Sequence, residues 1–292
     1  MSAIDRSIAP EPGPPRPYHF PEVTRQTLAN GLQVLIAENH NAPLVSLRVL
    51  LRAGADHDTK ELAGLASLTA DLLDEGAGSR NSIELAEEIG LLGAALGTGA
   101  DWDASYVSVD VLSRNVEPTV AITADVTRRP RFPEDGVERV RSERLTDLIQ
   151  QRDEAAAIAA KRFSHLIYGE GAYGNSIVGN PESVARITGA HVRDYYRAHY
   201  LPNNLSIVVD GDIETTRAIR LVEEQFGDWE RGVERERPTV SPREHEVSRI
   251  YLIDRPTAVQ SEIRIGHIGV PRSSDDSTSI RPRCAFTIRS AM

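Results

Sequence analysis

The order in which strand-like and helix-like segments follow one another is the feature that most constrains this fold. Two apolar, strand-like runs come first, and two amphipathic helical segments follow them. Two more strand-like runs then precede a long helical stretch, and a last strand and helix close the pattern. Runs of strands separated by runs of helices are typical of α+β domains. The sequence therefore predicts an α+β fold with an antiparallel-rich sheet covered by helices on one side.

Turn and capping residues delimit the expected elements. Asn30-Gly31 is a hairpin-type turn. Asp58 and Asn81 each stand three residues before a glutamate, which is the spacing of a capping box at a helix start. Pro133 suits the first position of a helix. The expected strands are 32–37, 44–51, 94–97, 105–112 and 205–209, and the expected helices are 58–76, 81–90, 117–127, 133–149, 155–168, 188–196 and 214–226.

Composition divides the chain into five parts. A proline-rich stretch comes first, and a polar segment rich in Arg, Glu and Pro follows the last expected helix. Beyond it, Ile250–Ile253 and Ile263–Ile268 have the pattern of the first two strands of a second domain. The expected divisions are a Pro-rich arm at 1–26, an α+β domain at 27–226, a linker at 227–247, the beginning of a second domain at 248–276 and an atypical tail at 277–292.

Charge and cysteine content exclude several classes of function. The 292 residues carry a net charge of −10, which disfavours nucleic acid and anionic membranes as partners. Cys284 is the single cysteine, so an intrachain disulfide and a cysteine zinc site are excluded. No apolar run has the length of a membrane span or a signal peptide. We therefore expect a cytoplasmic protein for the chain as written, whereas a wrongly assigned start codon would hide a signal peptide and imply the periplasm.

Five segments in the same order resemble the pitrilysin/insulinase-type zinc peptidases, which include the mitochondrial processing peptidases. That resemblance implies the fold expected above, and it implies two halves of similar fold that enclose a peptide. It also implies zinc as the family cofactor. The segments are Leu28–Val34, Leu50–Gly54, Glu61–Leu65, Ile89–Ala94 and the longer stretch Tyr168–Asp212.

The zinc motif of that family is absent here. The motif is His-x-x-Glu-His on a helix, where the two histidines share one face and the glutamate activates water. The corresponding residues are Ser67, Ala70 and Asp71, and the further acidic ligand falls near Asp147. Two separated carboxylates without an imidazole are a poor zinc site, and Ala70 cannot accept a proton. We therefore predict no catalytic residue, no bound metal and no cofactor.

Other patterns suggest no second catalytic site. His191 and His199 are eight residues apart on one expected helix, about 12 Å along its axis, which is too far to share an ion. Gly169–Gly174 fits a dinucleotide-binding pattern, but it follows a helix and runs into a loop, so it reads as a helix stop. Arg139–Arg144 alternates with glutamates, as solvated helix faces do.

Three functions stay open at this point. The first is a non-catalytic, peptidase-like subunit or fragment, which would pair with a zinc-bearing partner to enclose and bind peptides. The second is an active metallopeptidase that uses Asp71 and Asp147, and the third is a peptide-binding scaffold protein. Because the resemblance stops at Asp276, we also hypothesise a frameshift or premature stop near Thr278, which would truncate the second domain.

Overall fold

A single six-stranded sheet organises the domain. The computed structural model describes residues 13, 17, 20–239, 242, 247–256, 260–269 and 290–291. Neighbouring strands are antiparallel except for β2 and β8, which run parallel. The predicted α+β fold with an antiparallel-rich sheet is confirmed. In sheet order the strands are β1 (Val23–Thr27), β2 (Gln33–Glu38), β8 (Leu205–Gly211), β3 (Leu44–Leu51), β7 (Ser105–Leu112) and β6 (Ala95–Ala100).

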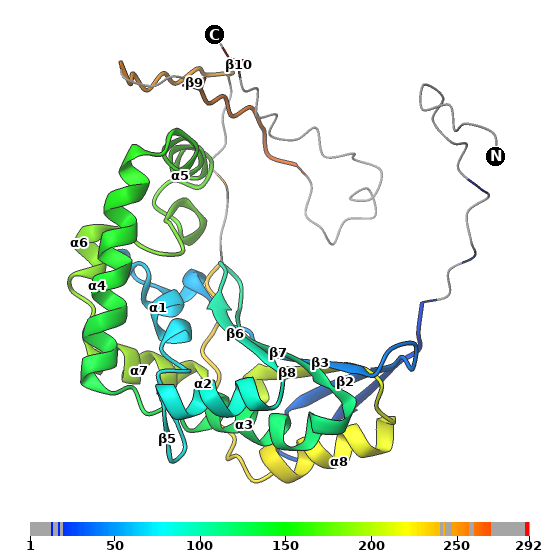
Figure 1. Ribbon diagram of the computed structural model, residues 1–292. Coiled ribbons are helices and arrows are strands. Elements are labelled where there is room, and N and C mark those ends of the chain that lie inside the picture. The colour runs from blue at the N-terminus through cyan, green and yellow to red at the C-terminus, as the bar shows by residue number, and fades with distance from the viewer. Residues whose placement is uncertain are drawn as a thin grey trace, which may run out of the picture.

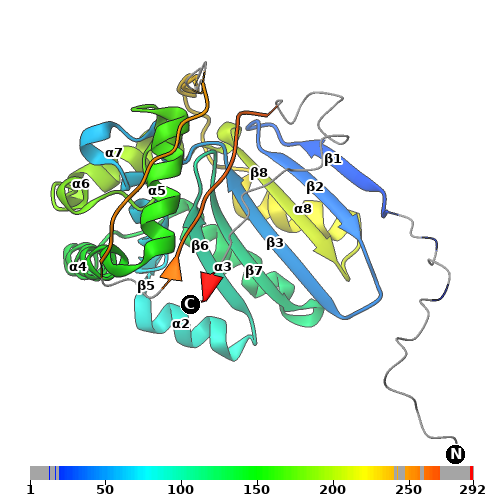
Figure 2. The ribbon, with the colours of Figure 1, turned by 90° about the horizontal axis from the view of Figure 1, so that it is seen from above.

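Alternation along the central strands decides which face of the sheet the helices cover. In β3, the side chains of Val45, Leu47 and Val49 are buried on one face, whereas Arg48 is exposed on the other. Strands β7 and β8 repeat this pattern. Helices α3 (Val116–Arg128) and α8 (Thr215–Phe226) cover the apolar face, and no described helix lies across the opposite, more polar face (Figures 1 and 2).

The other helices gather at the β6 side of the sheet. Helix α1 lies against β6 and β7, α7 packs on α1, and α4, α5 and α6 stand outside them (Figure 1). Short two-stranded pairs complete the described structure. The bounds are α1 (Leu65–Asp71), α2 (Ser82–Leu91), α4 (Glu134–Gln150), α5 (Ala155–Tyr168), α6 (Pro181–Val184), α7 (Gly189–His199), β4 (Gly76–Ala77), β5 (Arg80–Asn81), β9 (Gln260–Ser261) and β10 (Ser290–Ala291).

Helix α1 begins later than the sequence predicts, although Asp58 still caps it. The expected start at Asp58 is wrong, because two 3-10 turns occupy residues 55–57 and 60–62 and Gly64 takes a left-handed conformation with φ of 98°. A Cβ at Gly64 would lie 2.9 Å from the carbonyl oxygen of Val178. The Asp58 carboxylate folds back and accepts hydrogen bonds from the backbone N–H groups of Gly64 (2.8 Å) and Ala66 (2.9 Å). It therefore satisfies donors of the first turn from outside the helix.

The structure also differs from the expected ends of the domain. Residues 23–26, which we placed in the Pro-rich arm, belong to β1, whose largely exposed, mostly polar side chains give no hydrophobic signal. Ile250–Ile253 and Ile263–Ile268 are not strands, and their apolar side chains are exposed. Most of the tail at 277–292, including Thr278 and Cys284, lies outside the described residues; Ser290–Ala291 pairs with Gln260–Ser261.

The cap at α1 gives a test of stability against pH. Burial raises the pKa of Asp58 from 3.8 to about 7, although the N–H groups of Ala66, Gly64 and Leu65 oppose that shift. A raised carboxyl pKa means that the folded protein holds a proton which the unfolded chain releases, so stability falls as the pH rises from about 4 to about 7. Asp58→Asn keeps one acceptor oxygen and cannot ionise.

We expect the melting temperature of the parent, measured by circular dichroism, to fall relative to that of Asp58→Asn across this pH window. Asp58→Ala, which has no acceptor, should be less stable than Asp58→Asn by about 1 kcal/mol at all of these pH values. A parent protein that gained stability over Asp58→Asn with rising pH would contradict the assignment.

Candidate functional site

The three residues that replace the zinc motif lie on α1, and they have different surroundings. Helix α1 is a core element, since every residue from Leu65 to Ala70 is buried. Ala70 is 0% exposed, so its methyl group packs in the core. Ser67 and Asp71 are one turn apart on the same face, which is the spacing that the motif histidines would have.

An arginine from α4 joins these two positions. The Arg144 guanidinium donates one hydrogen bond to the Ser67 hydroxyl (3.1 Å) and another to the Asp71 carboxylate. Its side chain is 11% exposed and that of Asp71 is 32% exposed, so this ion pair is mostly shielded from water. A fixed cation therefore lies against the two positions where the family motif would place metal ligands.

Arg144 is the residue of this site that the sequence did not reveal. The interpretation of Arg139–Arg144 as a solvated face holds for Arg139, which is half exposed and pairs with Glu75 and Glu143. It holds less well for Arg141, which pairs with Glu138 but also donates to the carbonyl oxygens of Ala185 and Ile187. It is wrong for Arg144, which points inward to α1. The available signal was helical spacing, because Arg144 precedes the expected distal position Asp147 by one turn.

Asp147 itself is exposed on α4, and the described contacts do not join it to Ser67 or Asp71. Of the four expected positions, the structure thus brings two together through Arg144, holds Ala70 in the core, and leaves Asp147 facing solvent.

Carboxylates concentrate where α1 ends. Burial raises the pKa of Asp71, and Arg144 opposes that shift. Burial, with the nearby charges of Glu75 and Asp71, raises the pKa of Asp74 to about 6. The negative end of the helix dipole also lies here. A cation is favourable at this point, and the chain supplies one from its own α4.

The residues present do not fit a catalytic zinc ion. Such a site uses three protein ligands, mostly imidazole or carboxylate, and an open position for water. Here a hydroxyl, a methyl group and a carboxylate already paired with an arginine take the motif positions. Across the described ranges of the chain, no group of three or more His, Cys, Asp or Glu side chains converges as a metal site would require.

Strand β6, beside α1, forms one edge of the sheet. Its sequence, Ala-Leu-Gly-Thr-Gly-Ala, carries no charge. A Cβ at Gly99 would meet the Tyr106 hydroxyl at 2.6 Å and its ring at 2.8–3.3 Å, so glycine lets that cross-strand side chain lie over the strand. The other edge strand, β1, has exposed polar residues that include Arg25. Of the two edges, β6 lacks the charges that discourage pairing with another chain.

Two further observations concern membrane spans and the length of the chain. Within the described part, no helix is both long enough and apolar enough to cross a membrane. The chain spans about half the length of the curated relatives that it matches, since the first three are covered to 46%, 51% and 56%.

Known proteins with similar sequences are zinc proteases and processing peptidases. An uncharacterized zinc protease of Mycobacterium leprae is 25% identical over 70% of this chain and 46% of its own length. One from Bacillus subtilis is 23% identical over 71% of this chain and 51% of its own length. A probable mitochondrial-processing peptidase subunit beta of Arabidopsis thaliana is 23% identical over 70% of this chain and 39% of its own length.

Solved structures share the fold. The peptidase M16 inactive domain from Pseudomonas fluorescens superposes with a TM-score of 0.70 at 26% identity, covering 75% of this chain and 53% of that one. The periplasmic protease PqqL of Escherichia coli gives a TM-score of 0.69 at 18% identity, covering 76% and 25%.

Family models cover most of the chain. The model described as Insulinase (Peptidase family M16) matches residues 33–181, and the one described as Peptidase M16 inactive domain matches residues 186–281. With the fold and the order of motifs in agreement, this chain belongs to the insulinase family of peptidases, M16.

Proposed function

We propose that this chain is a non-catalytic M16 subunit that pairs with a zinc-bearing relative and helps to enclose and bind peptides. The observation that carries the proposal is Arg144, whose guanidinium donates a hydrogen bond to the Ser67 hydroxyl and forms a shielded ion pair with Asp71. A Zn²⁺ ion at these two positions would lie beside a like charge in a site of reduced dielectric, which strongly disfavours its binding. Family membership and the likeness to an M16 inactive domain support the same conclusion.

The uncharged edge of β6 is the surface we assign to peptide binding. Main-chain N–H and C=O groups on the free side of an edge strand can pair with an extended peptide, whatever its side chains. This edge lies next to α1, and the sheet face without helices opens beside it (Figure 2). A binding mode that relies on backbone groups would suit a protein that holds many different peptides.

Hydrolysis by reconstituted mixtures tests the subunit role. We expect no peptide cleavage by this chain alone, and cleavage by a mixture with a relative from the same genome that carries intact His-x-x-Glu-His. The same relative with its motif glutamate changed to glutamine is the control. Chelator-sensitive cleavage by this chain alone, with stoichiometric zinc, would instead support the active metallopeptidase that uses Asp71 and Asp147.

Peptides methylated at the backbone nitrogen test strand addition at β6. In an antiparallel pair, only alternate residues of the added strand direct their N–H groups at the edge. Methylating two of those residues should weaken binding about tenfold or more, because two main-chain hydrogen bonds are lost. Methylating the intervening residues should change the dissociation constant little. Equal losses of affinity for the two sets of methylated peptides, measured by fluorescence anisotropy, would rule out this binding mode.

The effect of Arg144 on zinc can be measured directly by restoring the histidines. Ser67→His with Asp71→His places two imidazoles at the motif spacing but leaves the guanidinium without its carboxylate. We expect adding Arg144→Gln to tighten zinc binding by about tenfold or more, since a charge close to the ion is removed. Arg139→Gln, which removes an equal charge from α4 without touching α1, is the matched control. Similar zinc affinities with and without Arg144 would show that the arginine is not the obstacle.

A scaffold without a peptidase partner is the remaining alternative. It would be favoured if this chain binds peptides but no mixture with a zinc-bearing relative cleaves them.

The division of residues 227–292 into linker, second domain and tail is part of the proposed subunit role, because enclosing a peptide requires a second half. The cytoplasmic compartment stays a prediction; the E. coli protein with this fold is described as periplasmic.

A further inference from the structure

The chain after α8 is a fixed strap, which we define as residues 228–237. It begins where the Asn30 carboxamide donates to the carbonyl oxygens of Phe226 (2.7 Å) and Trp229 (3.2 Å). Further on, the Asn203 carboxamide both accepts from the N–H of Gly232 (3.0 Å) and donates to its carbonyl (3.1 Å). The first half of the expected linker is therefore bound to the domain.

The anchors of the strap follow the order of the strands. Asn30 lies in the turn between β1 and β2, and Asn203 lies just before β8. Arg52, just after β3, pairs with Glu234 at 3.6 Å. Arg237 reaches the turn between β7 and β6, where it pairs with Asp103. The strap thus crosses the end of the sheet from one edge to the other (Figure 1).

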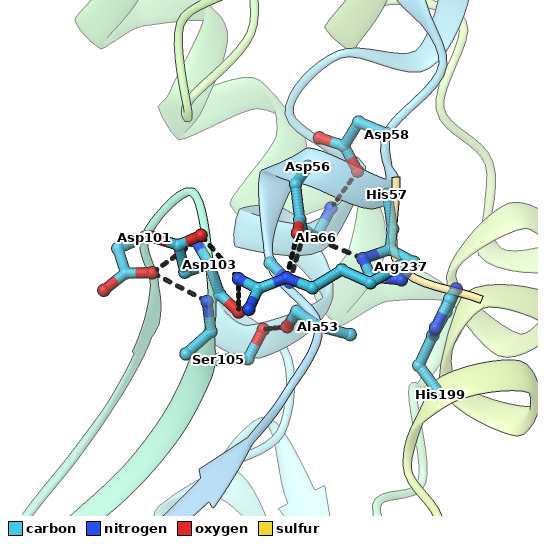
Figure 3. A network of polar contacts seen from close by, with 12 residues as sticks. Ala53, Asp56, His57, Asp58, Ala66, Asp101, Asp103, Ser105, His199 and Arg237 are labelled. Carbon is cyan, nitrogen blue, oxygen red and sulfur yellow. Dashed lines mark hydrogen bonds and ion pairs between the residues drawn. The ribbon is translucent and has the colours of Figure 1, made fainter. Parts of the chain in front are cut away.

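The last anchor is an ion pair with a buried carboxylate. The side chain of Asp56 is 1% exposed, and it accepts from Arg237 Nε (3.0 Å), the backbone N–H of Gly54 (3.0 Å) and the His57 ring (2.7 Å) (Figure 3). Burial alone would raise the pKa of Asp56, but these hydrogen bonds hold it below its ordinary value. The Arg237 side chain is half exposed, so water can solvate its charge when the ion pair breaks. The buried Asp56 carboxylate has no such access to water.

Asp56 is connected to the motif helix through Asp58. Asp56 lies in the 3-10 turn at residues 55–57, and the N–H of Asp58 closes that turn by donating to the carbonyl oxygen of Ala55 (3.2 Å). Burial is the main cause of the raised pKa of Asp58, and the charge on Asp56 adds to it. Asp58 in turn holds the first turn of α1 through the N–H groups of Gly64 and Ala66 (Figure 3). Without Arg237, two carboxylates in one buried turn would share less positive charge, and the cap on α1 would weaken.

We propose that the Arg237–Asp56 ion pair couples the strap to the start of α1, so that release of the strap loosens the first turn of the motif helix. The coupling runs from Arg237 through Asp56 and Asp58 to the N–H groups of Gly64 and Ala66. It does not depend on peptide binding or on a partner subunit, and it gives the strap an influence on the helix that carries Ser67, Ala70 and Asp71.

Amide hydrogen exchange of the full chain, followed by mass spectrometry, tests this coupling. In Arg237→Gln we expect exchange at residues 64–68 to accelerate about tenfold, together with faster exchange in the strap. Arg235→Gln removes an equal charge from an exposed residue two positions away, and this matched control should leave α1 unchanged. Arg237→Lys keeps the charge without the planar fork and should fall between parent and Arg237→Gln.

Circular dichroism first establishes that each variant is folded. If Arg237→Gln does not fold, Arg237→Lys against Arg235→Lys provides the same comparison with a smaller expected change. Faster exchange in the strap without any change at residues 64–68 would overturn the coupling, and so would equal acceleration in the Arg235 control. No change in either segment would show that the ion pair holds nothing in place.

Discussion

Arg144 meets an electrostatic requirement that the rest of the site depends on. The C-terminal end of α1 collects Asp71 and Asp74 where the helix dipole is negative, and burial makes their charges costly there. A metal ion is one way to balance such an end, and an arginine fixed on a neighbouring helix is another. The arginine has its positive charge at every pH at which the protein is folded, and it needs no ligand exchange. Its guanidinium also fills space and ties α4 to α1 through Ser67.

Helix α1 keeps a structural role that does not depend on metal chemistry. Its residues Leu65 to Ala70 are buried against β6, β7 and α7, so the helix forms part of the only large core that the described residues make. Ala70 illustrates the change, because a methyl group suits a core position that would be costly for an unpaired carboxylate. Packing alone therefore gives this helix a structural role in the fold.

Local patterns in the sequence predicted the elements well, and long-range contacts explain what was missed. Strands β3, β7 and β8 alternate clearly, so their positions and the α+β class followed from period-two hydrophobicity. Helix α1 was placed too early because Asp58 caps it from six residues away, across a 3-10 turn, rather than from the adjacent position. Arg144 has the sequence pattern of a solvated residue because it alternates with glutamates, as the half-exposed Arg139 does, and only tertiary packing distinguishes it. The strap has the Arg- and Glu-rich composition of a free linker, and its partners are far away in sequence.

The strap and the uncharged edge of the sheet meet at the same place. Arg237 contacts Asp103 in the turn that joins β6 to β7, and Tyr173 donates to the same carboxylate from the loop after α5. Whatever follows residue 237 therefore starts from the β6 side of the domain, next to the strand that we assign to peptides. One end of a peptide paired along β6 would lie near the turn between β6 and β7. The carboxylates of Asp56 and Asp103 join the strap to this turn and to the start of α1. Geometry thus joins the strap, the turn between β6 and β7 and the start of α1 in one continuous set of contacts.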